Sequence, residues 1–323
     1  MNISDRMTAH SLQKAPTGKD IMDAQSRIAS FIHKTPVFTS KAFDAMSNKS
    51  CLLKGEHLQK TGAFKARGAM NAVLIHRDSA QVSGFITHSS GNHGAALSWA
   101  AEQIGAPAYI VMPSNAPQAK IDAVKEYGGL ITFCDPTLEA RELTAAELQR
   151  STGALFIHPY DNYDVIAGQA TATLELLQEH PDLDWLFIPV GGGGLLAGAS
   201  LANYYFGKAK VVGCEPSNAD DAYKSFISKT RISVKTPNTI ADGLRTSLGV
   251  RNFPIILDHV NEIILLSEEE LENAWHICLS RTKQFIEPSA ASGIAAALKH
   301  QSTGKAGIIL CGGNMNTSQF ALR

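Results

Sequence analysis

The chain has 323 residues, of which 44% are hydrophobic and 18% charged, and its formal net charge at pH 7 is -1. This composition is ordinary for a globular protein, and the length suggests two core-forming units. Mixed charges offer no basic face for nucleic acid, and no apolar run approaches the ~18–20 residues that cross a membrane. The five dispersed cysteines lack metal-ligand spacing, so we expect no zinc site, no disulfide framework and a cytoplasmic location.

Helical and strand-like segments alternate along most of the sequence. A first helix is expected over residues 20–33, where Ile21, Ala24 and Ile28 recur at helical spacing. Strand and helix pairs are then expected over residues 85–87 and 92–104, 108–111 and 116–127, 130–133 and 137–150, 154–157 and 164–179, and 185–190 and 195–205. Two further strands are expected over residues 211–214 and 306–310. This alternation predicts an α/β fold of parallel sheets covered by helices, with ligands at the carboxyl ends of the strands.

A run of four glycines separates a buried-looking strand from a helix: Gly191, Gly192, Gly193 and Gly194. Glycine lets the backbone approach an anion closely, and a helix N-terminus offers free N–H groups and a partial positive charge. The run is neither a Walker loop nor G-x-G-x-x-G. A flexible turn is the alternative, but a phosphate cradle is favoured because consecutive glycines carry an entropic cost that an ordinary turn does not need.

A second strand-to-helix corner contains Ser89, Ser90, Gly91, Asn92 and His93. Its hydroxyls, side-chain amide and N–H groups suit a carboxylate and a polar ring substituent. The alternative is that Ser90 or Asn92 simply caps the helix.

Lys65 lies between Phe64 and Gly68. A single lysine is usually a solvated surface group. Here three corners suit anions or polar ring groups, at residues 89–93, 191–194 and 311–314, and together they favour a chemical role for this lysine. A lysine that forms a Schiff base needs a lowered pKa, which apolar surroundings supply.

Together these segments resemble the serine/threonine dehydratase and serine racemase family, whose members depend on pyridoxal 5′-phosphate (PLP). The resemblance spans residues 36–316 and rests on F-K-x-R-G at 64–68, S-S-G-N-H at 89–93, the four glycines and the final G-G-N, in the family order. Further matches are P-S-N-A-D-D at 216–221, I-A-D-G at 240–243 and I-E-P at 286–288, which are most similar to serine racemases.

The resemblance implies PLP fold type II, the tryptophan synthase β-like fold, with two open twisted, mostly parallel sheets flanked by helices. It implies a large cofactor-binding domain of residues 1–68 and 160–323 and a small substrate-binding domain of residues 69–159. PLP would lie in the cleft between these domains. Family members are usually homodimers.

The resemblance also implies residue roles. Lys65 would hold PLP as a Schiff base and remove the α-proton of the substrate, Phe64 would pack beside the ring, and Asn92 would bind the ring hydroxyl. The four glycines would bind the phosphate through main-chain N–H groups. Cys311 would lie opposite the pyridine nitrogen, where a neutral thiol favours loss of the β-hydroxyl over slow reprotonation. A buried structural cysteine is the alternative.

The substrate carboxylate would bind at residues 89–93. Ser90 would face the substrate opposite Lys65 and return a proton there, which racemisation requires; carboxylate binding or helix capping is the alternative. Arg141 and Thr246 match a pair that reaches towards the substrate hydroxyl. With Arg245 beside Thr246, these residues could adapt the site to 3-hydroxyaspartate, or the arginines could be surface charges.

Glu215, the carbonyl of Ala219 and Asp221 match a divalent-cation site of the family. Two carboxylates and a carbonyl suit Mg²⁺, Mn²⁺ or Ca²⁺, whereas two solvated surface acids are the alternative. An ATP site of some racemases is matched in part, by Lys60, Thr61, Tyr127, Glu287 and Asn314. Ala95 and Lys41 differ from the family at that site, so ATP binding stays an open question.

The expected function is conversion of L-serine, or of a related 3-hydroxy amino acid such as threonine or 3-hydroxyaspartate, to a 2-oxo acid and ammonia, with serine racemisation as a second activity. A dedicated serine racemase, or a dehydratase specific for threonine or 3-hydroxyaspartate, is the alternative. A non-catalytic amino-acid or nucleotide sensor would be expected to lack the lysine or the glycine run.

Overall fold

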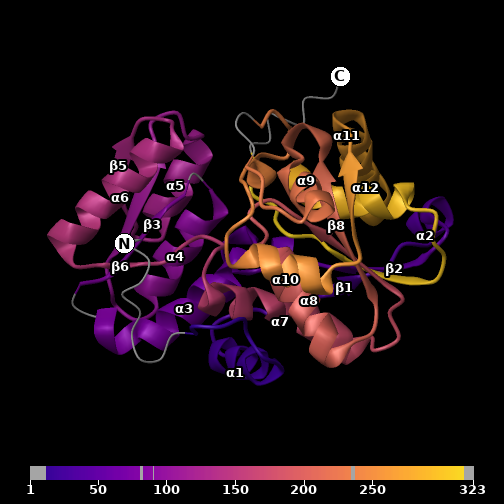
Figure 1. Cartoon of the computed structure of the whole chain (residues 1–323), viewed down its shortest axis with the longest axis horizontal. Coiled ribbons are helices and arrows are strands. Elements are labelled where there is room, and N and C mark those ends of the chain that lie inside the picture. The colour runs from indigo at the N-terminus through magenta and orange to yellow at the C-terminus, as the bar shows by residue number, and fades with distance from the viewer. Residues whose placement is uncertain (1–11, 81–82, 90, 234–236, 316–323) are drawn as a thin grey trace.

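The computed structural model describes residues 12–80, 83–89, 91–233 and 237–315, which fold into two β-sheets with helices packed around them (Figure 1). The larger sheet has the order β1-β2-β10-β7-β8-β9, and all neighbours are parallel except β1 and β2. The smaller sheet is parallel, with the order β5-β4-β3-β6. The strands are β1 (Val37–Phe38), β2 (Ser50–Lys54), β3 (Phe85–His88), β4 (Ala108–Pro113), β5 (Leu130–Cys134), β6 (Leu155–Phe156), β7 (Trp185–Pro189), β8 (Lys210–Pro216), β9 (Glu262–Leu266) and β10 (Lys305–Ile309). The predicted α/β class with two mostly parallel sheets is confirmed.

Figure 1 shows α4, α5 and α6 around the smaller sheet and α9, α11 and α12 around the larger one. Each sheet has its own buried apolar core. The division of the chain into domains of residues 1–68 with 160–323 and 69–159 stays a prediction. The helices are α1 (Gly18–Ile28), α2 (Lys41–Ser47), α3 (Lys65–Ala80), α4 (Asn92–Glu102), α5 (Gln118–Glu126), α6 (Leu138–Thr152), α7 (Tyr163–Glu179), α8 (Gly194–Phe206), α9 (Asp221–Ser228), α10 (Asn252–His259), α11 (Glu268–Ile277) and α12 (Ala291–Lys299).

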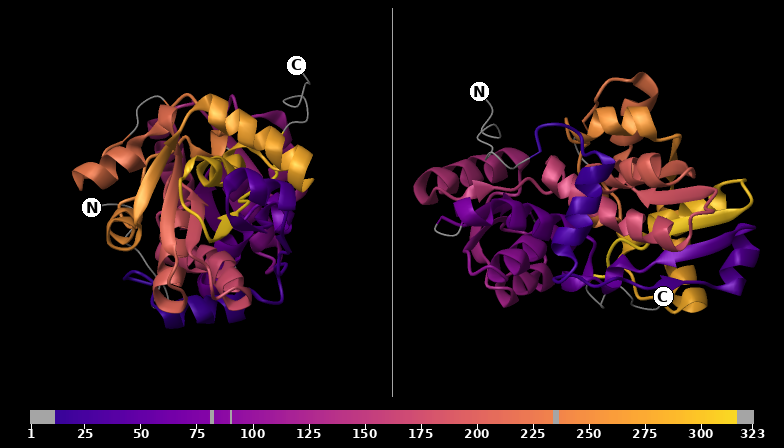
Figure 2. Two further views of the ribbon diagram at one scale, coloured as in Figure 1. Left: turned by 90° about the vertical axis from the view of Figure 1, so that its right-hand side faces the viewer. Right: turned by 90° about the horizontal axis from the view of Figure 1, so that it is seen from below.

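The first helix differs from its prediction at the C-terminal end. A capping box between Thr17 and Asp20 starts α1, and the helix buries Ile21 and Ile28 against α3, α7 and α8, in the middle of the view from below (Figure 2). Instead of continuing to residue 33, α1 ends at Ile28. The backbone N–H and carbonyl of His33 instead pair with the side-chain amide of Gln59, at 2.9 and 2.7 Å, so a long-range contact overrides the local helical pattern.

Helices α3 and α7 cross almost backbone to backbone. A Cβ on Gly168 of α7 would lie 2.6 Å from the carbonyl oxygen of Arg67 and 2.6 Å from the Cα of Gly68, so no larger residue fits at this crossing. The contact fixes the first turn of α3, the turn that begins with Lys65. No helix within the described ranges is long and apolar enough to cross a membrane.

Candidate active site

Lys65 lies at the N-terminus of α3, next to the end of β10. The N–H of Phe64 donates to the carbonyl of Cys311 over 3.0 Å, which ties the start of α3 to the segment that follows β10. The half-buried Lys65 donates from Nζ to the carbonyl oxygen of Pro159 over 2.7 Å, and Nζ lies 5.1 Å from the centre of the Phe64 ring and 5.9 Å from that of Tyr160. Burial lowers the pKa of Lys65 to about 8. The neutral, nucleophilic form of the amine is therefore far more abundant near neutral pH than in an ordinary lysine, although the protonated form remains the major one at pH 7.

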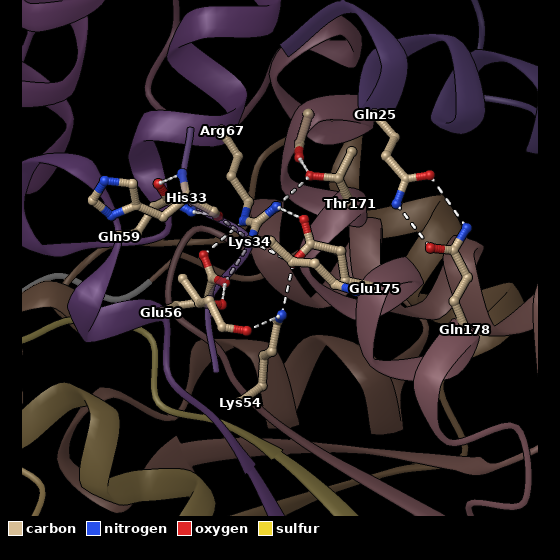
Figure 3. Close-up of polar contacts among 12 residues, drawn as sticks. Gln25, His33, Lys34, Lys54, Glu56, Gln59, Arg67, Thr171, Glu175 and Gln178 are labelled. Atoms are coloured by element: carbon tan, nitrogen blue, oxygen red, sulfur yellow. Dashed lines mark hydrogen bonds and ion pairs between the residues drawn. The ribbon is translucent and has the colours of Figure 1, made fainter. Parts of the chain in front are cut away.

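The opposite face of α3 is held by a buried network of charges, drawn in Figure 3. Arg67 forms paired hydrogen bonds with Glu56, at 2.7 and 2.8 Å, and with Glu175, at 2.7 and 2.9 Å. Lys54 completes the set by donating to Glu175 over 2.7 Å and to the carbonyl of Thr35 over 2.8 Å. The four charged side chains are almost fully buried and balance one another. The network therefore anchors the helix two residues after Lys65.

The four glycines join β7 to α8. Gly193 has a φ of +90°, a conformation that favours glycine, and no side chain caps the helix that follows it. A Cβ on Gly192 would lie 2.4 Å from the Tyr160 ring, and one on Gly191 would lie 2.9 Å from the Cα of Leu244. The close packing excludes side chains from this turn, so its main-chain N–H groups are the polar groups that it can offer to an anion.

Asn92 begins α4 and lies within a polar group that contains a buried carboxyl. Its Nδ2 donates to both oxygens of Glu287, at 2.9 and 3.1 Å, and its Oδ1 accepts from Asn314 over 3.0 Å. Burial and the charge of Asp242 raise the pKa of Glu287 to about 7. Sequence reasoning identified Glu287 only within the I-E-P match and the partial ATP site, and did not place it beside Asn92. The structure joins these residues from separate segments.

The remaining residues of the 89–93 corner lie as follows. Ser89 accepts from the N–H of Gly91 over 3.2 Å. His93 is buried, and burial together with the charge of Lys65 lowers its pKa well below the usual value, so its ring is neutral. Ser90 lies outside the described residues, and its predicted role stays a prediction.

Sequence reasoning missed Lys120 and identified Asp242 only within the I-A-D-G match at residues 240–243. They form an ion pair between α5 and the segment before α10. A Cβ added to Gly91 would lie 3.3 Å from Nζ of Lys120, so the ammonium group is close to the 89–93 corner. Both residues line a cavity of about 200 Å³ that also includes Asn92 and Asn314. The local sequence does not distinguish Lys120 from a surface charge, and only the tertiary contact brings it to Asp242 at this corner.

The Cys311 thiol is buried at the end of β10. Burial and the nearby Glu287 raise its pKa well above the usual value, so the thiol is neutral at physiological pH. Thr246 lies beside the glycine run, with Oγ1 3.2 Å from the place of a Cβ on Gly191. Arg141 belongs to α6, and its Nε donates to the carbonyl of Thr137. Burial of His88 and, to a smaller extent, the charge of Arg141 lower the pKa of His88 to about 4.

Glu215 and Asp221 are both buried beside the start of α9. Glu215 accepts from the N–H groups of Ala222 and Tyr223, each over 2.7 Å, and Asp221 accepts from Leu248 over 2.9 Å. The second oxygen of Asp221 is buried without a hydrogen-bond partner among the described residues. Burial raises the pKa of Glu215 to about 9 and that of Asp221 to about 6. Two acids at this depth, next to the buried Ala219, fit the donor set of a hard cation.

Two mostly parallel sheets flanked by helices, with a lysine of lowered pKa near a glycine turn, define the class of fold type II PLP-dependent enzymes. The chain belongs to the pyridoxal-phosphate dependent enzyme family, whose model matches residues 28–312. This confirms the family predicted from the sequence.

Its relatives include racemases and ammonia-lyases. The chain is 43% identical over 306 residues to the serine racemase of Oryza sativa subsp. indica, covering 92% of this chain and 90% of that protein. It is 42% identical over 311 residues to the L-threo-3-hydroxyaspartate ammonia-lyase of Saccharomyces cerevisiae, covering 95% of each. The solved structure of maize serine racemase matches with a TM-score of 0.92 and 40% identity, covering 95% of this chain and 96% of that one.

Proposed function

We propose that this enzyme converts L-serine or a related 3-hydroxy amino acid to a 2-oxo acid and ammonia, and racemises serine as a second activity. The observation that carries the proposal is that the start of α3, which bears the Lys65 amine, is hydrogen-bonded to the carbonyl of Cys311, whose thiol is buried. Similar identities to a serine racemase and to a hydroxyaspartate ammonia-lyase are compatible with both activities.

The residues present fit PLP. Gly191, Gly192, Gly193 and Gly194 would hold its phosphate through main-chain N–H groups, Phe64 would pack beside its ring, and Asn92 and Cys311 would face its polar ring atoms. PLP, when bound, supplies an electron sink for the negative charge that develops on the α-carbon of the substrate. Lys65 would carry the cofactor and then, as a free amine, take the α-proton.

The substrate carboxylate would bind at Ser89, Ser90, Gly91, Asn92 and His93. Ser90 would return a proton on the face opposite Lys65, which inverts the α-carbon. Arg141 and Thr246 would lie on the side of the β-substituent and influence the choice among serine, threonine and 3-hydroxyaspartate.

The neutral Cys311 would favour elimination. A thiol that keeps its proton would not hold a positive charge on the ring nitrogen as a carboxylate would. Negative charge at the substrate α-carbon would then be stabilised less, which would favour loss of the β-hydroxyl. Loss of the α-proton and the hydroxide, followed by hydrolysis, converts serine to pyruvate and ammonia with no net change in water. Racemisation would then be the slower outcome.

We also propose that Glu215, the Ala219 carbonyl and Asp221 hold Mg²⁺, Mn²⁺ or Ca²⁺ away from the reacting atoms. The buried Asp221 oxygen without a partner among the described residues supports this role. A homodimer in a reducing cytoplasm completes the proposal; the absence of disulfides among the five cysteines supports the location.

The test is a substrate panel with L-serine, D-serine, L-threonine and L-threo-3-hydroxyaspartate. Each reaction is assayed for 2-oxo acid and, by chiral chromatography, for the enantiomers of the remaining amino acid. We expect 2-oxo acid from at least one L-substrate and a smaller amount of D-serine from L-serine. No 2-oxo acid from any substrate would refute the ammonia-lyase assignment.

Two variants test the residue roles in the same assays. Lys65→Ala should abolish both products, and substantial turnover in it would contradict the role of Lys65. Ser90→Ala should suppress racemisation more than elimination from L-serine, because only racemisation needs a proton on the second face. Equal losses of both activities would contradict the role of Ser90.

A further inference from the structure

The carbonyl of Gly192 is held by two hydrogen-bond donors. Asn252, the first residue of α10, donates from Nδ2 over 2.7 Å, and the N–H of Gly249 donates over 3.1 Å. In a trans peptide the C=O and the following N–H point in opposite directions, so fixing the Gly192 carbonyl also fixes the direction of the Gly193 N–H. Asn252 therefore controls the orientation of a peptide unit in the middle of the glycine run.

The contacts of Asn252 also determine which end of its amide faces the glycines. Nδ2 lies near two carbonyl oxygens, that of Gly192 and, at 3.1 Å, that of Tyr160, and only the nitrogen end can donate to both. The Oδ1 atom is buried and has no hydrogen-bond partner within the described part of the chain. An apolar side chain of the same size would avoid burying this oxygen, but it would take one hydrogen-bond donor away from the Gly192 carbonyl and one from the Tyr160 carbonyl.

The segment of residues 158–161 connects these contacts to Lys65. Pro159 accepts from Nζ of Lys65 over 2.7 Å, and the ring of Tyr160 packs against the Cα of Gly192. Asp161 accepts from the N–H groups of Val250 and Arg251, at 3.1 and 2.7 Å, and so fixes the backbone that leads into α10. One short segment thus contacts the amine of Lys65, the glycine run and the start of the helix that carries Asn252.

We propose that Asn252 is a positioning residue of the phosphate cradle, which holds the Gly192 and Tyr160 carbonyls so that the main-chain N–H of Gly193 is oriented to bind the phosphate of PLP. The inference rests on the proposed role of the glycine run as that cradle. On this proposal, Asn252 strengthens binding of the phosphate group of PLP and does not affect the aldehyde group, which would react with Lys65.

The test compares PLP with pyridoxal, which lacks the phosphate but has the same aldehyde. Binding of each to the purified cofactor-free full-length chain is measured by absorbance titration. In Asn252→Leu, which is neutral and similar in size, we expect the dissociation constant of PLP to rise about tenfold or more and that of pyridoxal to stay unchanged. The phosphorus NMR resonance of bound PLP should also shift.

The matched control is Asn203→Leu. Asn203 lies near the other end of α8, is buried like Asn252 and also makes two hydrogen bonds, to the carbonyl and N–H of Ala209, at 2.7 and 3.1 Å. This variant should lower the unfolding temperature and leave the PLP to pyridoxal affinity ratio at its wild-type value. If Asn252→Leu does not fold, Asn252→Ser replaces it, because the shorter side chain cannot reach both carbonyls.

Three outcomes overturn the inference. Equal weakening of PLP and pyridoxal binding in the Asn252 variant would show a general structural effect, and unchanged binding of both would show no role. A wild-type protein without preference for PLP over pyridoxal would remove the phosphate cradle itself, and the inference with it. The first two outcomes refute the role of Asn252 but leave the glycine run as the phosphate site, whereas the third refutes the phosphate site itself. The failure of the inference is therefore distinguishable from the failure of the proposed function.

Discussion

Replacing Arg67 by methionine tests whether the buried charge network stabilises the fold around Lys65. Arg67 donates to Glu56, Glu175 and Thr171, and its side chain is fully buried. Without it, the two carboxylates share the single charge of Lys54, so a neutral cluster acquires a buried net charge of about -1. Removing one partner of a buried ion pair costs about 3–5 kcal/mol, and we expect a loss of this size in the free energy of unfolding.

The measurement is urea unfolding followed by fluorescence, with the midpoint expected to fall and the slope to stay constant. Arg77→Met is the matched control, because Arg77 lies on the same helix in an exposed pair with Asp78, whose side chains are 59% and 93% exposed. Such a surface pair contributes about 0–1 kcal/mol. A loss below ~1 kcal/mol in Arg67→Met, or an equal loss in both variants, would refute the reasoning.

Two further predictions concern protons and metal ions. Burial lowers the pKa of Lys65 from 10.5 to about 8, so the protonated amine costs stability below pH 8, and this cost disappears as the pH rises towards 10.5. The proposed reaction of Lys65 with PLP requires the neutral amine, so uptake of PLP by the cofactor-free protein, followed by absorbance, should accelerate with pH and level off above about 8. A midpoint near 10.5 would contradict the lowered pKa. Saturating Mg²⁺, Mn²⁺ or Ca²⁺ should raise the unfolding temperature of the wild type, by an amount equivalent to about 2.7 kcal/mol at a hundredfold excess over the dissociation constant. Asp221→Asn should lose this effect and Asp220→Asn, at a partly exposed pair with Lys224, should keep it; equal responses would exclude Asp221 as a ligand.

The parallel strands were predictable where a short apolar run is followed by a separate helical pattern, as in β3, β4, β5 and β7. Two adjacent apolar runs near residues 253–266 lack this separation, and periodicity does not distinguish a short buried strand from a short helix. One run became α10 and the other β9. The difference lies in tertiary pairing, since β9 aligns in register with β8 and α10 packs on α8.

The candidate site shows the same limit. Lys65, the glycine run and Asn92 were identifiable because their motifs are local in the sequence. Glu287, Lys120 and Asn252 come from segments that are far apart, and each contributes through a partner that only the fold brings near.

The buried network around Arg67 is the strongest case of information that local patterns lack. Lys54, Glu56, Arg67 and Glu175 are residue types that almost always lie at the surface. Arg67 belongs to the F-K-x-R-G match, but nothing in the immediate sequence of the other three distinguishes them from solvated charges. They are buried because each one satisfies the others, and no single one could be buried alone without a large desolvation cost. Arg67 is held on one face of α3 while Lys65 extends from the start of the same helix, so we expect the buried network to help set the position of the Lys65 amine through the helix.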